Sequence, residues 1–246
     1  MADADTTTIS RAERKRQVRI RGFVDAAKGI VARDGFEGLT MSRLANELDT
    51  VVSAVYRYFP SKGALLAEIQ KEAIERLTVS LSTISALNDS APAFQEVGER
   101  QESLVRLVLF GRWFCATSET YPEELRLLQM IMSQRESVLD PEGGARIFPL
   151  AMGLLSHAVV AIEVAQHTEA IEPGNSIDRA ALWASALSGV METDDLEKYV
   201  PELFGGARLA RLANLDLIRG WGADADMLAA ANDLVDSLGA ATPLAP

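Results

Sequence analysis

The sequence predicts an all-α fold, and three observations lead to it. Apolar residues recur every three or four positions along most of the chain, as at Ile20, Val24 and Ala27, which is the pattern of a helix with a buried face. No window shows the sustained alternation of apolar and polar residues that a half-buried strand requires. Glycine, proline and asparagine separate the periodic segments, as they do at helix ends. We therefore expect helices packed on helices and no sheet.

The composition is that of a globular protein. Of the 246 residues, 48% are hydrophobic and 24% are charged, which is typical of a chain that buries a core. Cys115 is the one cysteine in the sequence, so an internal disulfide is excluded, and this fits a reducing cytosol. The N-terminus is polar and acidic, without an apolar signal segment. These features predict a cytoplasmic protein.

One longer helix and one short helix come first, after a polar tail at residues 1–10. The longer helix follows the apolar positions from Ile20 onward and stops at Gly35. Thr40 precedes the short segment MSRLANEL, residues 41–48. Threonine is a favoured N-cap, because its hydroxyl accepts a hydrogen bond from a first-turn amide.

A second short helix and a long helix follow. The short helix is expected over residues 52–58, with Val55 and Phe59 directed inward. A proline after Phe59 ends it, because proline cannot donate the next backbone hydrogen bond. Ser61 is placed to cap a long helix over residues 61–87.

Six further helices are expected to complete the fold. They are predicted at residues 93–118, 122–135, 147–167, 176–192, 202–220 and 224–238. The short tails, residues 1–10 and 239–246, are expected to be disordered.

One apolar stretch, residues 148–165, approaches the length of a membrane span. It contains His157 and Glu163, which are costly inside a bilayer. We interpret it as a helix buried on most sides, and a membrane span stays open as the alternative.

Charge is distributed unevenly along the chain. The net charge is −11, which argues at first against a nucleic-acid partner. Residues 9–63, however, contain eleven lysine or arginine residues and only six acidic ones, whereas residues 64–246 carry a net charge of −14. A basic N-terminal quarter on an acidic body indicates two separate tasks, although charge alone does not identify them.

The two short helices, with a longer helix on either side, form a helix-turn-helix arrangement. In such an arrangement the second short helix lies in the DNA major groove. The segment YRYFPSK supplies two tyrosines, Arg57 and Lys62, all of which can donate to phosphate oxygens. The alternative from spacing alone is that Tyr56 and Tyr58 are half-buried packing residues and Lys62 is merely solvated.

Two segments resemble the DNA-binding domain of the TetR family of bacterial repressors: GFEGLTMSRLANEL (35–48) and AVYRYFPSKGALLAEI (54–69). The resemblance covers about residues 18–70. Farther on, LWASALSGVME (182–192) is similar to a loosely shared C-terminal helix of the family.

The resemblance implies an N-terminal helix-turn-helix DNA-binding domain and a larger helical domain for ligand binding and dimerisation. It also implies a homodimer on a palindromic DNA operator, released when a small molecule enters the larger domain. We expect the basic arm and helix-turn-helix domain over residues 11–63 and the effector-binding and dimerisation domain over residues 64–238, between the two tails.

The turn departs from the family pattern, which usually has a glycine in the turn and a serine or threonine as the cap of the recognition helix. Here the turn is Leu48-Asp49-Thr50-Val51. Aspartate tolerates left-handed backbone better than most residues, and Thr50 is expected to cap in place of the missing serine. Val51 and Val52 could contact thymine methyl groups, or the operator could be read through shape and phosphates. The base contacts therefore stay open.

A basic arm, RAERKRQVRIR (11–21), precedes the helix-turn-helix. Flexible basic arms can follow the DNA backbone or enter the minor groove, and the alternative is a solubilising, partly helical extension. The candidate DNA-binding residues are Arg14, Lys15, Arg16, Arg19, Thr40, Ser42, Thr50, Val51, Val52, Ser53, Tyr56, Arg57, Tyr58 and Lys62.

Helices 176–192 and 202–220 are expected to form the dimer contact. Each has apolar residues on more than one side, so each needs partners on more than one side. Pairing with their copies would make a four-helix interface, and the alternative is that they complete a large monomer core.

The middle helices hold large apolar residues that could enclose a small apolar or aromatic effector. A stripe of methionine and aromatic residues at helical spacing is also typical of plain core. The candidate ligand-binding residues are Arg106, Phe110, Trp113, Phe114, Gln129, Met130, Met152 and His157.

No motif for catalysis, a metal or a cofactor is found. His157 and His167 are ten residues apart and point in different directions on one helix. The sequence has no glycine-rich phosphate loop and no nucleophile elbow. These absences argue against an enzyme, and the resemblance to the TetR family implies a ligand-responsive transcriptional repressor. The alternative is an all-helical small-molecule-binding or adaptor protein with weakened DNA binding.

Overall fold

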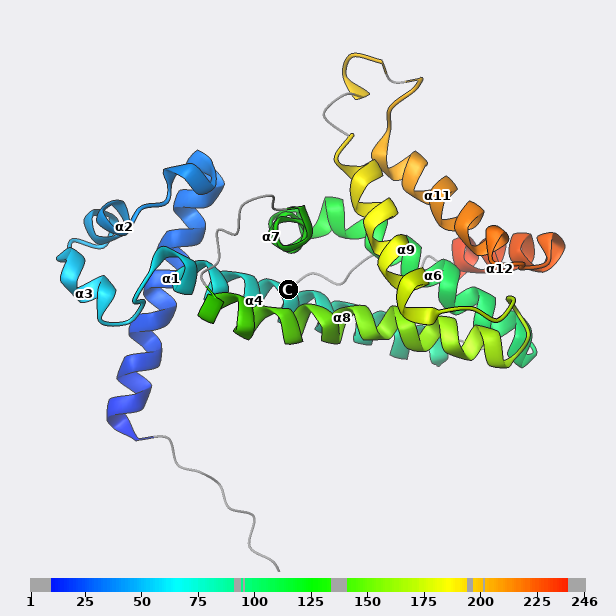
Figure 1. The fold of residues 1–246 in the computed structure, drawn as a ribbon, viewed down its shortest axis with the longest axis horizontal. Helices are drawn as coiled ribbons and strands as arrows, with labels where there is room; N and C mark the ends of the chain where they lie inside the picture. The colour runs from blue at the N-terminus through cyan, green and yellow to red at the C-terminus, as the bar shows by residue number, and fades with distance from the viewer. Residues whose placement is uncertain are drawn as a thin grey trace, which may run out of the picture. The chain divides into compact units, whose positions relative to one another are not determined.

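The computed structural model describes residues 10–90, 94, 96–133, 141–193, 197–200 and 202–238. These residues form helices and the turns between them, with no strand in the described part of the chain (Figure 1). The helices are α1 (Arg11–Gly38), α2 (Met41–Glu47), α3 (Val52–Tyr56), α4 (Lys62–Asp89), α6 (Glu99–Thr120), α7 (Pro122–Ser133), α8 (Pro141–His167), α9 (Ser176–Met191), α11 (Gly206–Gly220) and α12 (Ala225–Leu238). The predicted all-α fold is confirmed. The predicted tails lie outside the described residues, except for Ser10.

The described residues fall into two compact units. The first comes from residues 1–70 and 136–147, and the second from residues 71–135 and 148–246. Helix α4 contributes its first residues to the first unit and the remainder to the second.

The first unit is built around α1, α2, α3 and the start of α4. As predicted, Val55 and Phe59 point inward and are almost fully buried. The Phe59 ring meets the buried Phe23 ring of α1 edge to face, with ring centroids 6.2 Å apart. The predicted caps are also confirmed, because Thr40 accepts from the Arg43 amide at 3.1 Å and Ser61 accepts from the Ala64 amide at 2.9 Å.

Helix α1 begins earlier than expected. Residues 11–21, predicted as a flexible arm, form its first turns. The Ser10 hydroxyl accepts a hydrogen bond from the Glu13 amide at 3.1 Å, which caps the helix. The negative charge of Glu13 in the first turn also interacts favourably with the positive end of the helix dipole. The predicted stop at Gly35 is an interruption with φ +69° inside a segment that ends at Gly38.

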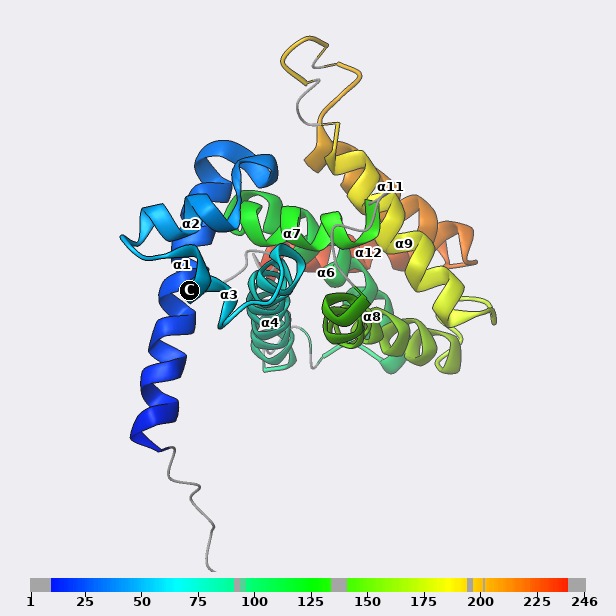
Figure 2. The same cartoon turned by 60° about the vertical axis from the view of Figure 1, so that its left-hand side comes forward.

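The second unit is centred on α6, which is buried around most of its circumference. Helices α9, α11 and α12 pack on it, and α9 also packs on α11 (Figure 2). The two largest fully buried side chains are Trp113 of α6 and Trp183 of α9. This arrangement explains why α6 lacks the one-sided pattern of a surface helix.

Helix α8 is exposed on more of its surface than the sequence predicted. Its segment Gly143–His167 is long and apolar enough to cross a membrane, with mean hydropathy 1.9, yet only 22% of the window is buried. The buried residues follow one face, at Leu154, Ala158 and Ile162. The prediction of a helix buried on most sides is therefore wrong, because hydropathy reports composition and not which face packs. His157 and Glu163 are exposed, a costly arrangement for a lipid-facing helix.

Three helix starts differ from their predicted positions. Helix α6 begins at Glu99 instead of residue 93, and α11 begins at Gly206 instead of residue 202. Helix α8 begins at Pro141, six residues before its predicted start. Proline is well suited to the first turn of a helix, where its missing N–H is not needed.

Stability above about pH 9 is expected to fall because of Cys115. Burial raises the pKa of its thiol to about 11 from the ordinary value of 9.0, so the folded state keeps the proton that the unfolded chain loses. Below pH 9 the full stability is present, and by pH 10 we expect a loss of about 1 kcal/mol. Chemical unfolding at pH 8 and pH 10 measures it. In Cys115→Ala this part of the pH dependence should vanish, and an identical dependence in both proteins would contradict the assignment.

Candidate functional sites: a nucleic-acid interface and an apolar cavity

The turn between α2 and α3 has the backbone that a tight helix-turn-helix needs. Asp49 lies in the left-handed region, with φ +47°, as the sequence predicted. The Thr50 amide donates to the Ala45 carbonyl at 2.9 Å, and this closes the turn. An aspartate thus occupies the place for which glycine is usual, at the modest cost of left-handed backbone.

The predicted cap of α3 is wrong. Val51, not Thr50, is the N-cap residue, and no side chain caps the helix. Because α3 begins at Val52, the capping position falls on Val51, which has no hydroxyl. Val51 is 67% exposed, Val52 is half-buried and Ser53 is exposed. The leading end of α3 therefore presents an apolar surface beside a hydroxyl.

The block after α3 divides into exposed and packed side chains. Tyr56 is 48% exposed, and Arg57 is exposed. Tyr58 is half-buried, and its ring centroid lies 5.4 Å from that of Phe23. The Arg57 guanidinium lies over the Tyr58 ring, 5.4 Å from its centroid. Tyr56 and Arg57 are thus the groups of this block most open to a partner, and Tyr58 supports Arg57.

Lys62 has a structural partner. Its half-buried side chain reaches back to α1, where Nζ donates to the Phe36 carbonyl at 2.8 Å. This bond ties the start of α4 to the end of α1. An ammonium carries three donors, so a phosphate contact by Lys62 remains a proposal in addition to this role.

The remaining polar candidates lie on α1 and at the start of α2. The Thr40 hydroxyl is engaged as the cap of α2, and Ser42 is exposed in its first turn. On α1, Arg14, Lys15, Arg16 and Arg19 are all exposed. Arg16 lies 3.9 Å from Glu13, and Arg19 lies over the Phe23 ring at 5.2 Å.

The second unit contains a cavity of about 240 Å³ that is lined almost entirely by apolar side chains. Four predicted ligand-binding residues line it: Phe110, Trp113, Phe114 and Met152. Six further lining residues were not predicted, namely Leu128, Phe148, Ala151, Leu154, Leu155 and Ala184. Met152 and Phe148 are 51% and 57% exposed, so the cavity opens beside α8. The indole N–H of Trp113, one of the lining residues, donates to Ser80 at 3.2 Å.

The other four predicted ligand-binding residues lie outside this lining. Arg106 is held by Glu102 and Asp89, at 2.7 Å and 2.8 Å. His157 is exposed, and Gln129 and Met130 are half-buried. Arg106 therefore serves an ion-pair network, and none of the described residues that line the cavity carries a charge.

A metal centre is not found in the part of the chain that the structure describes, since no group of three or more His, Cys, Asp or Glu side chains gathers there.

Comparison with known proteins places the first unit in a known domain family. Residues 23–69 match the family model described as bacterial regulatory proteins, tetR family. The transcriptional repressor KstR of Mycolicibacterium smegmatis is 38% identical over 68 residues, which cover 28% of this chain and 32% of the repressor. KstR of Mycobacterium tuberculosis is 40% identical over 63 residues, covering 26% of this chain and 27% of its own length. The chain thus spans about a third of the length of the curated relatives it matches.

Solved structures match over most of the chain and show the fold. A Rhodococcus protein of unknown function covers 89% of this chain and 99% of its own, with TM-score 0.60 and 17% identity. A regulator from Saccharomonospora viridis in complex with choline has TM-score 0.57 and 18% identity, covering 82% and 96%. FadR of Bacillus subtilis in complex with stearoyl-CoA has TM-score 0.55 and 15% identity, covering 81% and 98%.

Proposed function

We propose that the chain is a regulator of the TetR family, because residues 23–69 match the model of that family, and that it is a cytoplasmic transcriptional repressor released from its operator by a small molecule. The observation that carries the proposal is the helix-turn-helix itself. Its turn is closed by left-handed Asp49, and its second helix ends in exposed Tyr56 and Arg57. Hydroxyl and guanidinium groups at this place are suited to DNA phosphates.

DNA contact is proposed to combine phosphate binding with limited base readout. Arg57 and Tyr56 supply donors to the backbone, and the exposed residues of α1 add positive charge. Val51, exposed and apolar, is placed to meet a thymine methyl group in the major groove. Asp49 is exposed in the same turn and would repel a phosphate nearby, which disfavours a backbone contact there.

The effector is proposed to be uncharged and apolar or aromatic. Choline and stearoyl-CoA, the ligands named for two structures of the same fold, both carry charge. A charged group in this cavity would be desolvated without an opposite charge or a hydrogen-bond partner, which costs several kcal/mol. A dry apolar cavity of roughly 150 Å³ holds benzene, so about 240 Å³ suits a somewhat larger molecule, on the scale of a two-ring compound.

A homodimer through α9 and α11 is proposed. On α9, Ala181, Ser185 and Gly189 are exposed at a spacing of four, flanked by Ile177 and Leu182 at 59% and 55% exposure. A smooth face of small residues with apolar edges lets a second helix approach closely. A two-fold pair of such faces would set two recognition helices at a fixed spacing on the operator.

Replacing Arg57 with alanine is expected to weaken binding to every duplex by about tenfold and to lower the slope of log affinity against log salt by about one, because one phosphate contact is lost. Fluorescence anisotropy measures this, with operators selected from genomic fragments. The control is Arg219→Ala, which removes an exposed arginine that pairs with Asp216 on α11. A loss confined to certain sequences would contradict the phosphate role. If the intact protein selects no fragment yet binds apolar compounds, the adaptor alternative replaces the repressor.

A further inference from the structure

The cavity wall made by Phe110 rests on aromatic rings that do not themselves line the cavity. The Phe110 ring lies on α6, and its centroid is 4.8 Å from that of Trp183 on α9. Trp183 is fully buried and meets Trp221 at a right angle, with centroids 5.7 Å apart. The position of Phe110 thus depends on how Trp183 is held.

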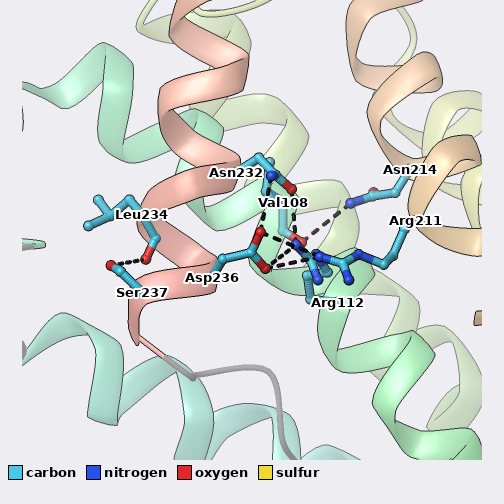
Figure 3. Close-up of polar contacts among 8 residues, drawn as sticks. All are labelled: Val108, Arg112, Arg211, Asn214, Asn232, Leu234, Asp236 and Ser237. Carbon is cyan, nitrogen blue, oxygen red and sulfur yellow. Dashed lines mark hydrogen bonds and ion pairs between the residues drawn. The ribbon is translucent and has the colours of Figure 1, made fainter. Parts of the chain in front are cut away.

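Trp183 is held by a buried amide on α11. Its indole nitrogen donates to Asn214 Oδ1 at 2.8 Å, and Asn214 Nδ2 donates to the Val108 carbonyl of α6 at 3.3 Å. Asn214 is 1% exposed. Its carboxamide therefore connects α9 to α6 from α11, and a buried amide is costly unless both its ends are paired. Figure 3 shows Asn214 reaching Val108.

Gly111, next to Phe110 on α6, makes room for this amide. A Cβ at Gly111 would collide with the Asn214 carboxamide. A glycine inside a buried helix costs roughly 1 kcal/mol relative to alanine. The close approach explains why a glycine occupies this position, and it fixes Asn214 against the α6 backbone beside the cavity wall.

We propose that Asn214 is a positioning residue for the effector cavity: from α11 it holds the Trp183 ring, and through it the Phe110 wall, in the shape that accepts an apolar ligand. The inference rests on the proposed function of the cavity. Helix α11, which belongs to the proposed dimer contact, would then help to shape the cavity although it contributes no lining residue. Packing of α11 and affinity for the effector are then linked.

A purely stabilising role for Asn214 is the competing explanation. A second set of hydrogen bonds, which also joins α6 to α11, provides the control. Arg112 of α6 and Arg211 of α11 both donate to Asp236 of α12 (Figure 3). Arg112 also donates to Asn232 at 3.0 Å. This cluster joins α6, α11 and α12 without touching Phe110 or Trp183. Asp236→Ala should lower stability while leaving the wall in place.

The experiment measures binding of 6-propionyl-2-(dimethylamino)naphthalene, an uncharged two-ring fluorophore, to the full chain. Asn214→Leu removes both hydrogen bonds at similar volume and should raise the Kd about tenfold, the order expected for one buried hydrogen bond. The near-ultraviolet circular dichroism of the tryptophans should weaken as well. Asn214→Asp, whose protonated carboxyl can accept from Trp183 and donate to Val108, should recover affinity as pH falls. Asp236→Ala should bind as the wild type does.

Different results would contradict the positioning role of Asn214 and the assignment of the cavity as a ligand site. Unchanged affinity in Asn214→Leu, or an equal loss in Asp236→Ala, would overturn the positioning role while the cavity itself stands. Should Asn214→Leu fail to fold, the test rests on Asn214→Asp. A fluorophore affinity of Asn214→Asp that does not change with pH would contradict the positioning role of Asn214. A wild-type protein that binds no fluorophore would remove the cavity assignment and the inference with it.

Discussion

Replacing Ala181 with arginine is expected to convert the proposed dimer into a monomer and to lower its operator affinity by about a hundredfold or more. Ala181 is exposed on α9, on the side away from fully buried Trp183 and Leu187. A long charged side chain there would hold two helices apart and lose hydration on contact. Two linked recognition helices bind far more tightly than one, because the second binds at high effective concentration.

Sedimentation at micromolar concentration and anisotropy on a two-fold related operator test this result together. The control is Ala230→Arg, the same change at an exposed position of α12. It should leave both the dimer and the operator affinity as they are. A dimeric Ala181→Arg protein would move the subunit contact away from this face of α9. A monomeric one that still bound the operator normally would show that pairing is not needed for affinity.

Local rules predicted the first unit well. The caps at Thr40 and Ser61, the left-handed Asp49 and the inward Val55 each follow from residues within four positions along the chain. Such interactions are visible in sequence because their partners are neighbours. The cap predicted at Thr50 was wrong because α3 begins at Val52, which puts Val51 at the capping position, and valine has no oxygen that could accept a first-turn amide.

Contacts between distant segments were not predictable in this way. Lys62 bonds to the Phe36 carbonyl, 26 positions away, and no pattern in the sequence indicates a lysine held by a backbone oxygen. The same holds for Asn214, whose partners Val108 and Trp183 lie 106 and 31 positions away. An asparagine on the buried face of a helix signals a buried polar contact, but the sequence does not name its partner.

The cavity was predicted through Met152 and three of its four aromatic lining residues, whereas Phe148 and the aliphatic lining residues were missed. Phe110, Trp113 and Phe114 stand out in a sequence that is only 6% aromatic. Ala151 and Leu154 do not, because the same residues fill any helical core. Arg106 was chosen for its ability to orient a ligand, and the structure places it in ion pairs with Glu102 and Asp89 instead.

Filling the cavity from α9 is expected to abolish its binding of apolar compounds. Ala184 is a lining residue, so Ala184→Phe would place a ring inside the cavity. A fluorophore that loses on the order of 100 Å² of apolar contact loses about 2.5 kcal/mol, and its Kd should rise by roughly a hundredfold. Met152 is a poorer site for this change, because a half-exposed side chain at the opening can turn toward solvent.

The filled protein also tests whether the cavity controls DNA binding. A ligand shifts an equilibrium only if it binds the two states differently, so an occupied cavity must favour one state. Ala184→Phe should therefore either mimic the effector, with operator affinity lowered without any compound, or keep full affinity that no compound can lower. Ala230→Phe, an equal change at an exposed position of α12, should respond as the wild type does. If compounds that bind the wild-type cavity leave operator affinity the same, and Ala184→Phe does too, the cavity is not coupled to DNA and release by an effector must be abandoned.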